Sequence, residues 1–259
     1  MEPVALRFAA DVAWIEFGDP AARNLLTVPL LEALPRALAE AEVRGARVAV
    51  LRGRGDLWSG GYDIGQIPSE LFTTAPGAAL DHPFERCMRA VEACPLPTLA
   101  AVNGHAVGGS VELALACDLR LLVDTAKIGI TAAKLGLVYP HGGIERLWHT
   151  VGPAHAREIL FTGELFSAAD ALRLGLVNRT VPAAGFDAAV QTLAARMAAA
   201  APLAVQGMKH VLQLLERGSL SESDVAGILD LRARSYASQD FREGRAAFQE
   251  KRPPNFRGS

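Results

Sequence analysis

The sequence predicts an α/β protein in which a core of alternating strands and helices is followed by a layer of helices. Three observations support this fold class. The chain has 259 residues, of which 50% are hydrophobic and 21% charged, a composition typical of a globular protein with a sizeable core. Short β-branched runs alternate with helical periodicity in the first half, as in βαβ units. From Gly142 onward the periodicity is almost purely helical.

The N-terminal elements are a hairpin and a helix. Residues 4–8 and 12–17 have the alternation of two strands joined by a tight bend. Thr27 is a suitable N-cap for a helix that runs to about Arg44, because leucines recur behind it at helical spacing. Pro35 lies inside this helix and predicts a kink.

The remaining elements continue this pattern in chain order. Strands are predicted at residues 47–51, 98–102 and 119–123, and helices at residues 83–93 and 110–117. Ser167 followed by Asp170 is typical of a helix N-cap, and a short strand is expected at 176–181. Long helices are predicted at residues 186–200, 203–216 and 221–238. Asp240 is expected to cap a last helix.

Charge and cysteine content argue against several classes of function. Lys+Arg number 26 and Asp+Glu 28, and the resulting net charge of −2 argues against nucleic-acid binding. The three cysteines form no CxxC pair, which disfavours a disulfide framework or a zinc site and suits a reducing cytoplasm. The sequence shows no targeting segment and no apolar stretch of roughly 18–20 residues. We therefore expect a cytoplasmic protein with no membrane contact and no metal site.

The segment AVNGHAVGGSVELALACDLRL, residues 101–121, carries the most information about function. A predicted strand ends, Gly108 and Gly109 follow, and a predicted helix begins. Glycine lets a ligand approach the backbone closely, and a helix N-terminus adds N–H donors without helical partners. The segment therefore predicts a site for an anion, or for an oxygen that becomes anionic during a reaction.

Glu112 lies one turn into this helix among apolar neighbours. Burial would raise its pKa towards the range useful for acid–base catalysis, whereas the alternative is a glutamate on the exposed face of an amphipathic helix. A second loop, residues 57–64 (LWSGGYDI), could present another backbone N–H or could be an ordinary tight turn. Ser110 lies outside a GxSxG motif, so we expect no serine nucleophile.

Together these features resemble the crotonase superfamily of enoyl-CoA hydratase/isomerase-like proteins over nearly the whole chain. Further matching stretches are Asn24 with Leu26-Thr27, Gly136, Gly142-Gly143, Arg146-Leu147, residues 160–182 and the tail of residues 240–256. The resemblance implies a crotonase-like ββα spiral core over residues 1–195 and a C-terminal helical trimerisation layer over residues 196–259. It also implies a homotrimer or hexamer.

The resemblance implies that the protein binds an acyl-CoA thioester, or an acyl-carrier-protein thioester, with no cofactor beyond the coenzyme A of the substrate. The backbone N–H groups of Tyr62 and Gly109 would form an oxyanion hole, and Glu112 would be catalytic. The other residues at substrate- or CoA-binding positions are Arg23, Gly60, Asp63, Ile64, Gly108, Phe248 and Lys251. For Phe248 the alternative is core packing, and for Lys251 it is a solvated surface charge.

The sequence departs from the hydratases of this family at one position. Such hydratases use two glutamates, and Ala132 occupies the position of the second. Lys134 would share a face with Ala132 only if this segment were extended. The motif LGLVYP, residues 135–140, instead resembles the methylmalonyl-CoA decarboxylase branch, in which a tyrosine, here Tyr139, orients the substrate carboxylate. The alternative for Tyr139 is a core aromatic residue whose hydroxyl bonds a backbone carbonyl.

The resulting hypothesis is decarboxylation of a methylmalonyl- or ethylmalonyl-type thioester. Loss of CO2 leaves a thioester enolate that the Tyr62 and Gly109 N–H groups would stabilise, with Tyr139 holding the departing carboxylate. An ionised Glu112 would repel that carboxylate, so it must be protonated, turn away or destabilise the ground state. Two alternatives remain: an enoyl-CoA hydratase or double-bond isomerase with Glu112 as its sole acid–base group, and a non-catalytic acyl-CoA-binding scaffold.

Overall fold

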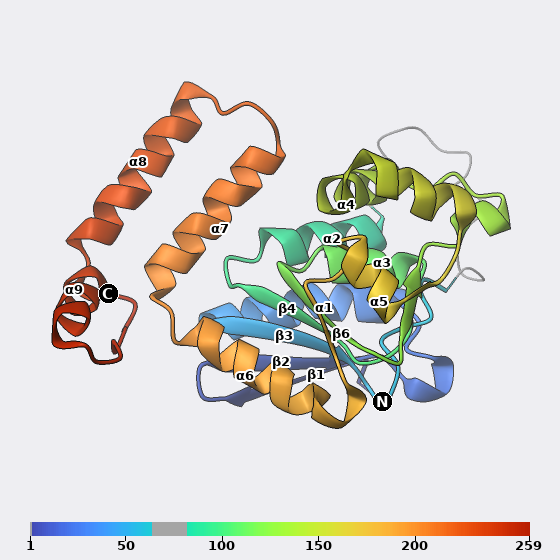
Figure 1. The fold of residues 1–259 in the computed structure, drawn as a ribbon, viewed down its shortest axis with the longest axis horizontal. Coiled ribbons are helices and arrows are strands. Elements are labelled where there is room, and N and C mark those ends of the chain that lie inside the picture. Colours follow the sequence, from blue (N-terminus) through green and yellow to red (C-terminus); the bar gives the residue numbers. More distant parts are fainter. Residues whose placement is uncertain (1, 64–81) are drawn as a thin grey trace.

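A computed structural model describes residues 2–63 and 82–259 of the chain (Figure 1). It confirms the α/β class, because strands and helices alternate through the first half and helices dominate the second. Ile64, which the family resemblance assigns to substrate binding, lies outside the described residues.

The larger sheet has the strand order β1-β2-β3-β4-β6-β9 among the described residues. Its strands are β1 (Val4–Ala9), β2 (Val12–Phe17), β3 (Val48–Gly53), β4 (Thr98–Val102), β6 (Leu119–Val123) and β9 (Arg179–Val181). β1 and β2 form the predicted antiparallel hairpin, and each later pair of neighbours is parallel. A parallel sheet is covered on both faces, which explains why β2, β3 and β4 are buried along nearly their whole length.

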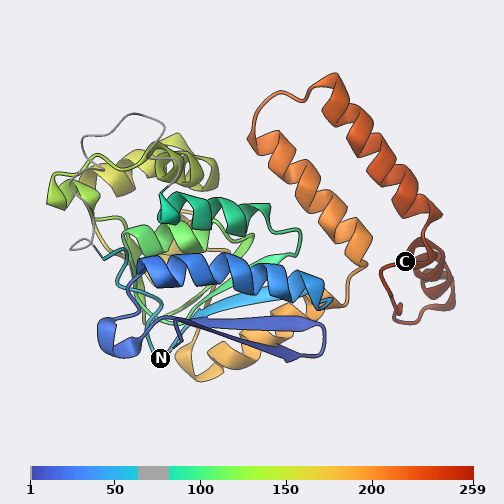
Figure 2. The same ribbon diagram turned by 180° about the vertical axis from the view of Figure 1, so that it is seen from behind.

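Helices cover both faces of this sheet. The helices in the described part of the chain are α1 (Val28–Val43), α2 (Pro83–Ala93), α3 (Gly109–Leu115), α4 (His141–Thr162), α5 (Ala168–Arg173), α6 (Phe186–Ala198), α7 (Pro202–Glu216), α8 (Glu222–Ala237) and α9 (Gln239–Glu250). α1, α2 and α3 lie on one side of the sheet and α6 on the other (Figures 1 and 2). Thr27 occupies the N-cap of α1 without a side-chain capping bond, and the helix is continuous through Pro35.

The loop after β3 is anchored in the hydrophobic core by Trp58. This side chain is fully buried and meets Phe17 edge-on, with ring centroids 4.9 Å apart. Its indole N–H donates a hydrogen bond to the Ser110 carbonyl oxygen at 2.9 Å. A buried indole with both its apolar ring and its N–H satisfied fixes its surroundings. Trp58 therefore joins the loop after β3 to the first turn of α3, where the predicted site lies.

A smaller sheet was not foreseen from the sequence. Its strands are β5 (Ala106–Val107), β7 (Lys127–Gly129) and β8 (Phe166–Ser167), in the order β5-β7-β8. Strands of two or three residues are too short to show a period-2 pattern, so hydrophobic periodicity could not reveal them. β5 leads directly into α3, and the small sheet therefore helps to fix where that helix begins.

The C-terminal helices α7, α8 and α9 extend away from the sheet (Figures 1 and 2). The expected boundary between residues 195 and 196 falls inside α6, which packs on β2 and β3. Among the described residues, no helix by itself has the length and hydropathy to cross a membrane. Residues 183–198 and 202–216 meet those criteria only as a pair, and that pair is bent by 99°.

The last helix is capped by a different residue from the one expected. Ser238 is the N-cap of α9, and its hydroxyl accepts a hydrogen bond from the Phe241 N–H at 3.0 Å. The predicted cap, Asp240, lies in the first turn and accepts bonds from the N–H groups of Arg257 and Gly258 at 2.7 and 2.9 Å. Ser and Asp are both good N-caps, and spacing alone did not distinguish them. Asp240 instead holds the C-terminal tail against α9.

Candidate active site

Two glycine-containing loops meet at the start of α3. Ser59, in the loop after β3, forms a parallel bridge with Ala106 of β5. The Ser59 N–H donates to the His105 carbonyl oxygen and the Val107 N–H donates to the Ser59 carbonyl oxygen, both at 3.2 Å. The buried Ser110 hydroxyl lies 2.9 Å from the carbonyl oxygens of Ser59 and Val107. Ser110 thus links the two loops, in line with the expectation that it is not a nucleophile.

This packing brings Tyr62 and Gly109 together. A Cβ placed on Gly109 would lie 3.4 Å from the Tyr62 Cβ, and one placed on Gly61 would lie 3.6 Å from the Gly109 nitrogen. Gly61 has a φ of +99°, and its Cβ would lie 2.5 Å from the Val107 carbonyl oxygen, so only glycine fits there. Neither the Tyr62 N–H nor the Gly109 N–H donates a hydrogen bond to another described residue. The structure therefore places the two predicted donors in neighbouring, contacting segments.

The Tyr62 side chain packs against the start of α2. Its hydroxyl lies 3.3 Å from Nε2 of His82, and the Phe84 ring meets it edge-on at 5.7 Å between centroids. His82 Nδ1 accepts from the Phe84 N–H at 3.2 Å, which assigns the ring proton to Nε2. Burial lowers the pKa of His82 and favours this neutral form. Phe84 also lies within 3.0 Å of a Cβ placed on Gly109, so α2 forms one wall beside the two N–H donors.

Glu112 is buried in α3 with 1% of its surface exposed, which excludes the alternative of a glutamate on an exposed helix face. Its Oε2 accepts a hydrogen bond from Nη1 of Arg146 in α4 at 2.9 Å. Burial raises the pKa of Glu112 to about 7, although Tyr139 and Arg146 act in the opposite direction. At neutral pH both protonation states are therefore populated, which suits acid–base catalysis.

The first turn of α4 lies directly against the Glu112 carboxyl group. A Cβ placed on Gly143 would lie 2.6 Å from both Cδ and Oε2 of Glu112. A Cβ placed on Gly142 would lie 3.1 Å from Oε2 of Glu85. Contacts of 2.6 Å between heavy atoms that are not hydrogen-bonded are strongly repulsive, so a side chain at position 143 would displace the Glu112 carboxyl group. The glycine pair at the start of α4 therefore serves the close approach of backbone and carboxylates.

Tyr139 lies beside Glu112 in the segment that precedes α4. Its hydroxyl is buried and completes no regular hydrogen bond with another described residue. The alternative of a core tyrosine whose hydroxyl bonds a backbone carbonyl is therefore not what the structure shows. Burial and then the charge of Glu112 raise the pKa of Tyr139 well above its ordinary value. Tyr139 is thus a neutral donor, and its proximity lowers the pKa of Glu112 even though the two groups are not aligned as a regular hydrogen bond.

The segment at the position of the second hydratase glutamate is a turn of 3-10 helix over Ala132–Leu135. Ala132 is buried, whereas Lys134 is exposed and its side chain runs past Gly163, where a Cβ would lie 3.3 Å from the Lys134 Cγ. Because the segment is helical rather than extended, Lys134 does not share the face of Ala132. Neither residue offers Glu112 a second proton-transfer group.

Residues expected to bind substrate lie around the two loops. The Gly60 N–H donates to the Arg23 carbonyl oxygen, and the Gly108 N–H donates to the Gly129 carbonyl oxygen, each at 2.9 Å. Arg23 is exposed, and Asp63 directly follows Tyr62. The structure therefore brings Arg23, Gly60 and Asp63 to the loop that carries one N–H donor, and Gly108 to the loop that carries the other.

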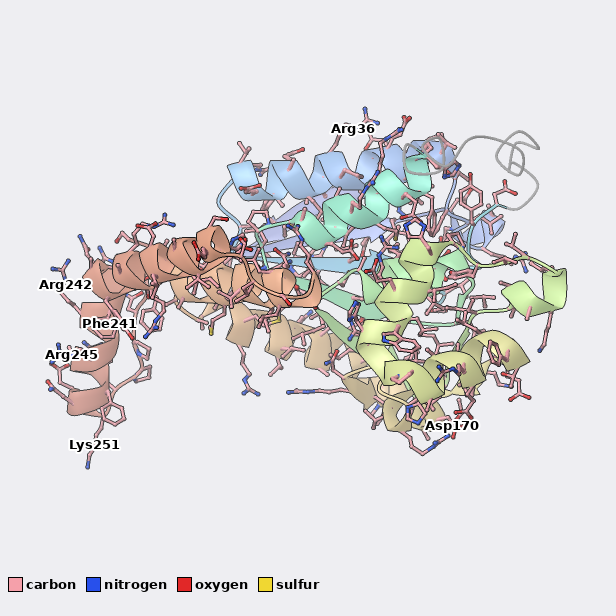
Figure 3. The ribbon with its side chains drawn as sticks, turned by 90° about the horizontal axis from the view of Figure 1, so that it is seen from above. Arg36, Asp170, Phe241, Arg242, Arg245 and Lys251 are labelled. Carbon is pink, nitrogen blue, oxygen red and sulfur yellow. The ribbon has the colours of Figure 1, made fainter. Side chains whose placement is uncertain are left out.

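Phe248 and Lys251 are not brought to this place within one chain. Both belong to the end of α9, and Figure 3 shows Lys251 at the tip of the C-terminal layer, far from the sheet and its covering helices. The Phe248 side chain is 87% exposed, which excludes the alternative of core packing within one chain. Lys251 is exposed as well. Its exposure fits both the predicted contact with coenzyme A and the alternative of a solvated surface charge.

Sequence reasoning missed the ionic surroundings of Glu112. Besides Glu112, Arg146 contacts Glu92 Oε1 at 2.5 Å and Glu85 Oε2 at 3.4 Å. In the sequence, Arg146 stands out only as part of a stretch that matches the family. Glu85 and Glu92 are seven residues apart, so they share a face of α2, and this spacing is the signal that could have been noticed. Their partner on α4 depends on tertiary packing and cannot be predicted from spacing.

The chain is similar to known proteins over nearly its whole length. Residues 7–259 match the family model described as "Enoyl-CoA hydratase/isomerase". A relative from Mycobacterium bovis named "Probable enoyl-CoA hydratase echA6" is 34% identical over 99% of this chain and 100% of its own. Carnitinyl-CoA dehydratase from Proteus mirabilis is 35% identical over 82% of both chains. The crystal structure of an enoyl-CoA hydratase/carnithine racemase from Magnetospirillum magneticum matches with a TM-score of 0.91 at 33% identity, covering 100% of this chain and 97% of that one.

Proposed function

The chain belongs to the enoyl-CoA hydratase/isomerase family of the crotonase superfamily, whose members process acyl-CoA thioesters, and we propose that it decarboxylates a malonyl-type acyl-CoA. The observation that carries this proposal is the Tyr139 hydroxyl, which is buried beside the Glu112 carboxyl group and interacts with it without completing a regular hydrogen bond to a described residue. A buried donor without a partner is costly unless a ligand supplies the acceptor. A carboxylate on the α-carbon of the substrate would be that acceptor.

The proposed reaction breaks the bond between the α-carbon and the carboxylate carbon. The bonding electron pair moves into the thioester as an enolate, and CO2 leaves. The Tyr62 and Gly109 N–H groups would stabilise the enolate oxygen, and removal of one such donor typically costs about 3 kcal/mol of transition-state stabilisation. Tyr139 would hold the carboxylate out of the plane of the thioester, so that the breaking bond overlaps the carbonyl π system.

Glu112 fits this route in its protonated form. Its pKa of about 7 means that the neutral acid is well populated at neutral pH, and the neutral acid does not repel a substrate carboxylate. After CO2 has left, protonated Glu112 would donate its proton to the α-carbon and be reprotonated from solvent. Decarboxylation should therefore be faster below pH 7 than above it.

The test is to incubate the purified protein separately with methylmalonyl-CoA, ethylmalonyl-CoA and crotonyl-CoA and to identify the products by mass. We expect loss of CO2 from a malonyl thioester. The variant Tyr139→Phe removes only the hydroxyl and should lower kcat/KM about 10- to 100-fold, because a hydrogen bond to a charged group contributes about 1.5–3 kcal/mol. The matched control is Tyr236→Phe, at a tyrosine of α8 that is 57% exposed. Rapid hydration of crotonyl-CoA with both malonyl thioesters untouched would overturn the proposal.

A second candidate is an enoyl-CoA hydratase or double-bond isomerase with Glu112 as its sole acid–base group. The pKa of Glu112 and the hydratase and dehydratase names of the relatives favour it. In an isomerase, Glu112 would remove a proton from one carbon and return it to another. Such a base acts in its ionised form, so this activity should increase as the pH rises through 7. The direction of the pH profile therefore distinguishes the two candidates. Binding of acyl-CoA without turnover of any thioester would instead favour a non-catalytic acyl-CoA-binding scaffold.

We also propose a cytoplasmic homotrimer or hexamer that needs no cofactor beyond the coenzyme A of its substrate. Large apolar side chains are exposed along the C-terminal layer, among them Met208, Leu212, Leu215 and Leu229. Apolar groups gathered on one layer are typical of an interface between subunits. Phe248 and Lys251 would then reach the acyl-CoA of a neighbouring subunit. Among the described residues no three His, Cys, Asp or Glu side chains are arranged to hold a metal ion.

A further inference from the structure

The Arg146 guanidinium is shared among three carboxylates that come from two helices. Its Nη1 lies 2.9 Å from Glu112 on α3, its Nε lies 2.5 Å from Glu92 on α2, and its Nη2 lies 3.4 Å from Glu85 on α2. The Arg146 side chain is only 10% exposed and Glu85 14%, whereas Glu92 is 39% exposed. One buried cation therefore faces three carboxyl groups, of which Glu92 is partly exposed and Glu112 is buried.

We propose that Glu85 and Glu92 are positioning residues for the proton chemistry of Glu112, and that they act by keeping Arg146 from pairing fully with it. This inference rests on the proposed acid–base role of Glu112 and identifies what sets that role. In the absence of its α2 partners, the guanidinium would be free to form a two-point contact with Glu112 and would hold it in the ionised form.

Arg146 makes more contacts with Glu92 than with Glu112. Glu92 contacts it at two nitrogens, through Oε1 to Nε at 2.5 Å and through Oε2 to Nη2 at 3.5 Å. Glu112 has a single contact, to Nη1 at 2.9 Å. An arginine that forms a forked pair with one carboxylate has its orientation fixed by that pair. Arg146 is therefore oriented mainly by Glu92 and meets Glu112 only with its remaining edge.

The other groups that face Glu112 fit this account. Glu85 is close enough that its charge raises the pKa of Glu112, and its Oε1 is buried with no partner among the described residues. Tyr139, in the segment before α4, is neutral and lowers the pKa of Glu112 as Arg146 does. Although burial lowers the pKa of Arg146, its bond to Glu92 and the three nearby carboxylates raise it, so Arg146 stays charged. The carboxylates of Glu85 and Glu92 therefore counteract the effect of the Arg146 charge on Glu112.

The test measures the protonation of Glu112 itself, by 13C NMR of protein labelled at the glutamate carboxyl groups, with the signal assigned from its loss in Glu112→Gln. We expect Glu92→Gln to lower the titration midpoint of Glu112 by about one pH unit, because Arg146 turns towards Glu112. Glu85→Gln should lower it as well, since a like charge is removed. The matched control is Glu145→Gln, at the neighbour of Arg146 on α4, whose side chain is 67% exposed; it should leave the midpoint unchanged.

A midpoint unchanged in both Glu85→Gln and Glu92→Gln, with Glu112→Gln still removing the signal, would overturn the inference. Glu92 is partly exposed, so its variant should fold, and a normal unfolding temperature confirms that it does. The titration uses no substrate, and this separates the inference from the proposed function. Midpoints that shift as expected in a protein inactive on every thioester would support the tuning of Glu112 and count against decarboxylation.

Discussion

Glu112 combines nearly complete burial with a hydrogen bond from Arg146 and a less regular contact with the Tyr139 hydroxyl. A carboxylate in this state is poorly solvated and only partly stabilised by its neighbours, so burial raises its pKa from the ordinary 4.5 to about 7. Because the folded protein binds the proton more tightly than the unfolded chain, this residue makes stability depend on pH. The stabilising effect of the proton is fully present below about pH 4.5 and is lost as the pH rises through 7.

At the residue scale we therefore predict a pH-dependent difference between the wild type and Glu112→Gln. The variant cannot ionise at this position, so it should not share the loss of stability that the wild type shows as the pH rises. Between pH 4.5 and pH 8, the free energy of unfolding of the variant relative to that of the wild type should increase by about 3 kcal/mol at most. Urea unfolding at a series of pH values measures this difference. Glu158→Gln, at an exposed position on α4, is the control and should run parallel to the wild type. A constant difference between variant and wild type would show that Glu112 titrates normally.

At the scale of secondary-structure elements, a buried lysine attaches α7 to the core. Lys209 is 7% exposed, and its Nζ donates hydrogen bonds to the Leu96 carbonyl oxygen at 2.9 Å and to Asp118 Oδ2 at 2.7 Å. The same Asp118 oxygen accepts bonds from the N–H and hydroxyl of Thr98 at the start of β4. This network joins the first helix of the C-terminal layer to the sheet.

We predict that Lys209→Met lowers the free energy of unfolding by about 2 kcal/mol, because Asp118 loses its cation and the Leu96 carbonyl loses its donor. Amide hydrogen exchange should accelerate in α7 while the strands of the larger sheet keep their protection. Lys134→Met, at an exposed lysine, provides the comparison and should have little effect. Unchanged exchange in α7 would mean that apolar packing alone holds the helix.

Elements with a clear local signal could be predicted from the sequence to the residue. The helix at 83–93 begins at a proline suited to the first turn, and the strand at 98–102 is apolar after Thr98. The small sheet and the 3-10 turn at Ala132–Leu135 could not be predicted, because such short segments take their conformation from tertiary contacts. The site divides in the same way: Glu112 and its glycines lie in one stretch, whereas the Arg146 contacts require α2 and α4 to meet.

At the scale of the whole molecule, the C-terminal layer presents apolar side chains that one chain leaves uncovered. On α7, Met208 and Leu212 are 59% and 60% exposed and lie four residues apart, so they share a face of the helix. The same layer carries Phe248 and Lys251, which the family resemblance assigns to coenzyme A. Assembly and substrate binding would then depend on the same part of the chain.

We predict that Leu212→Glu lowers the oligomer mass measured by light scattering after size-exclusion chromatography, because burial of a carboxylate in an apolar interface is costly. The control is Val43→Glu, at the end of α1, where the valine is 86% exposed; it should keep the mass of the wild type. A monomeric wild type, or an unchanged mass in Leu212→Glu, would show that this face is not the interface.

The approach of Gly143 to the Glu112 carboxyl group also limits protein engineering at this site. The methyl group of an alanine at position 143 would lie 2.6 Å from the Glu112 carboxyl carbon, so any substitution there has to displace the carboxyl group. A side chain introduced at this position to change the substrate range would therefore also move the acid. The α4 backbone at Gly143 sets how much room the Glu112 carboxyl group has.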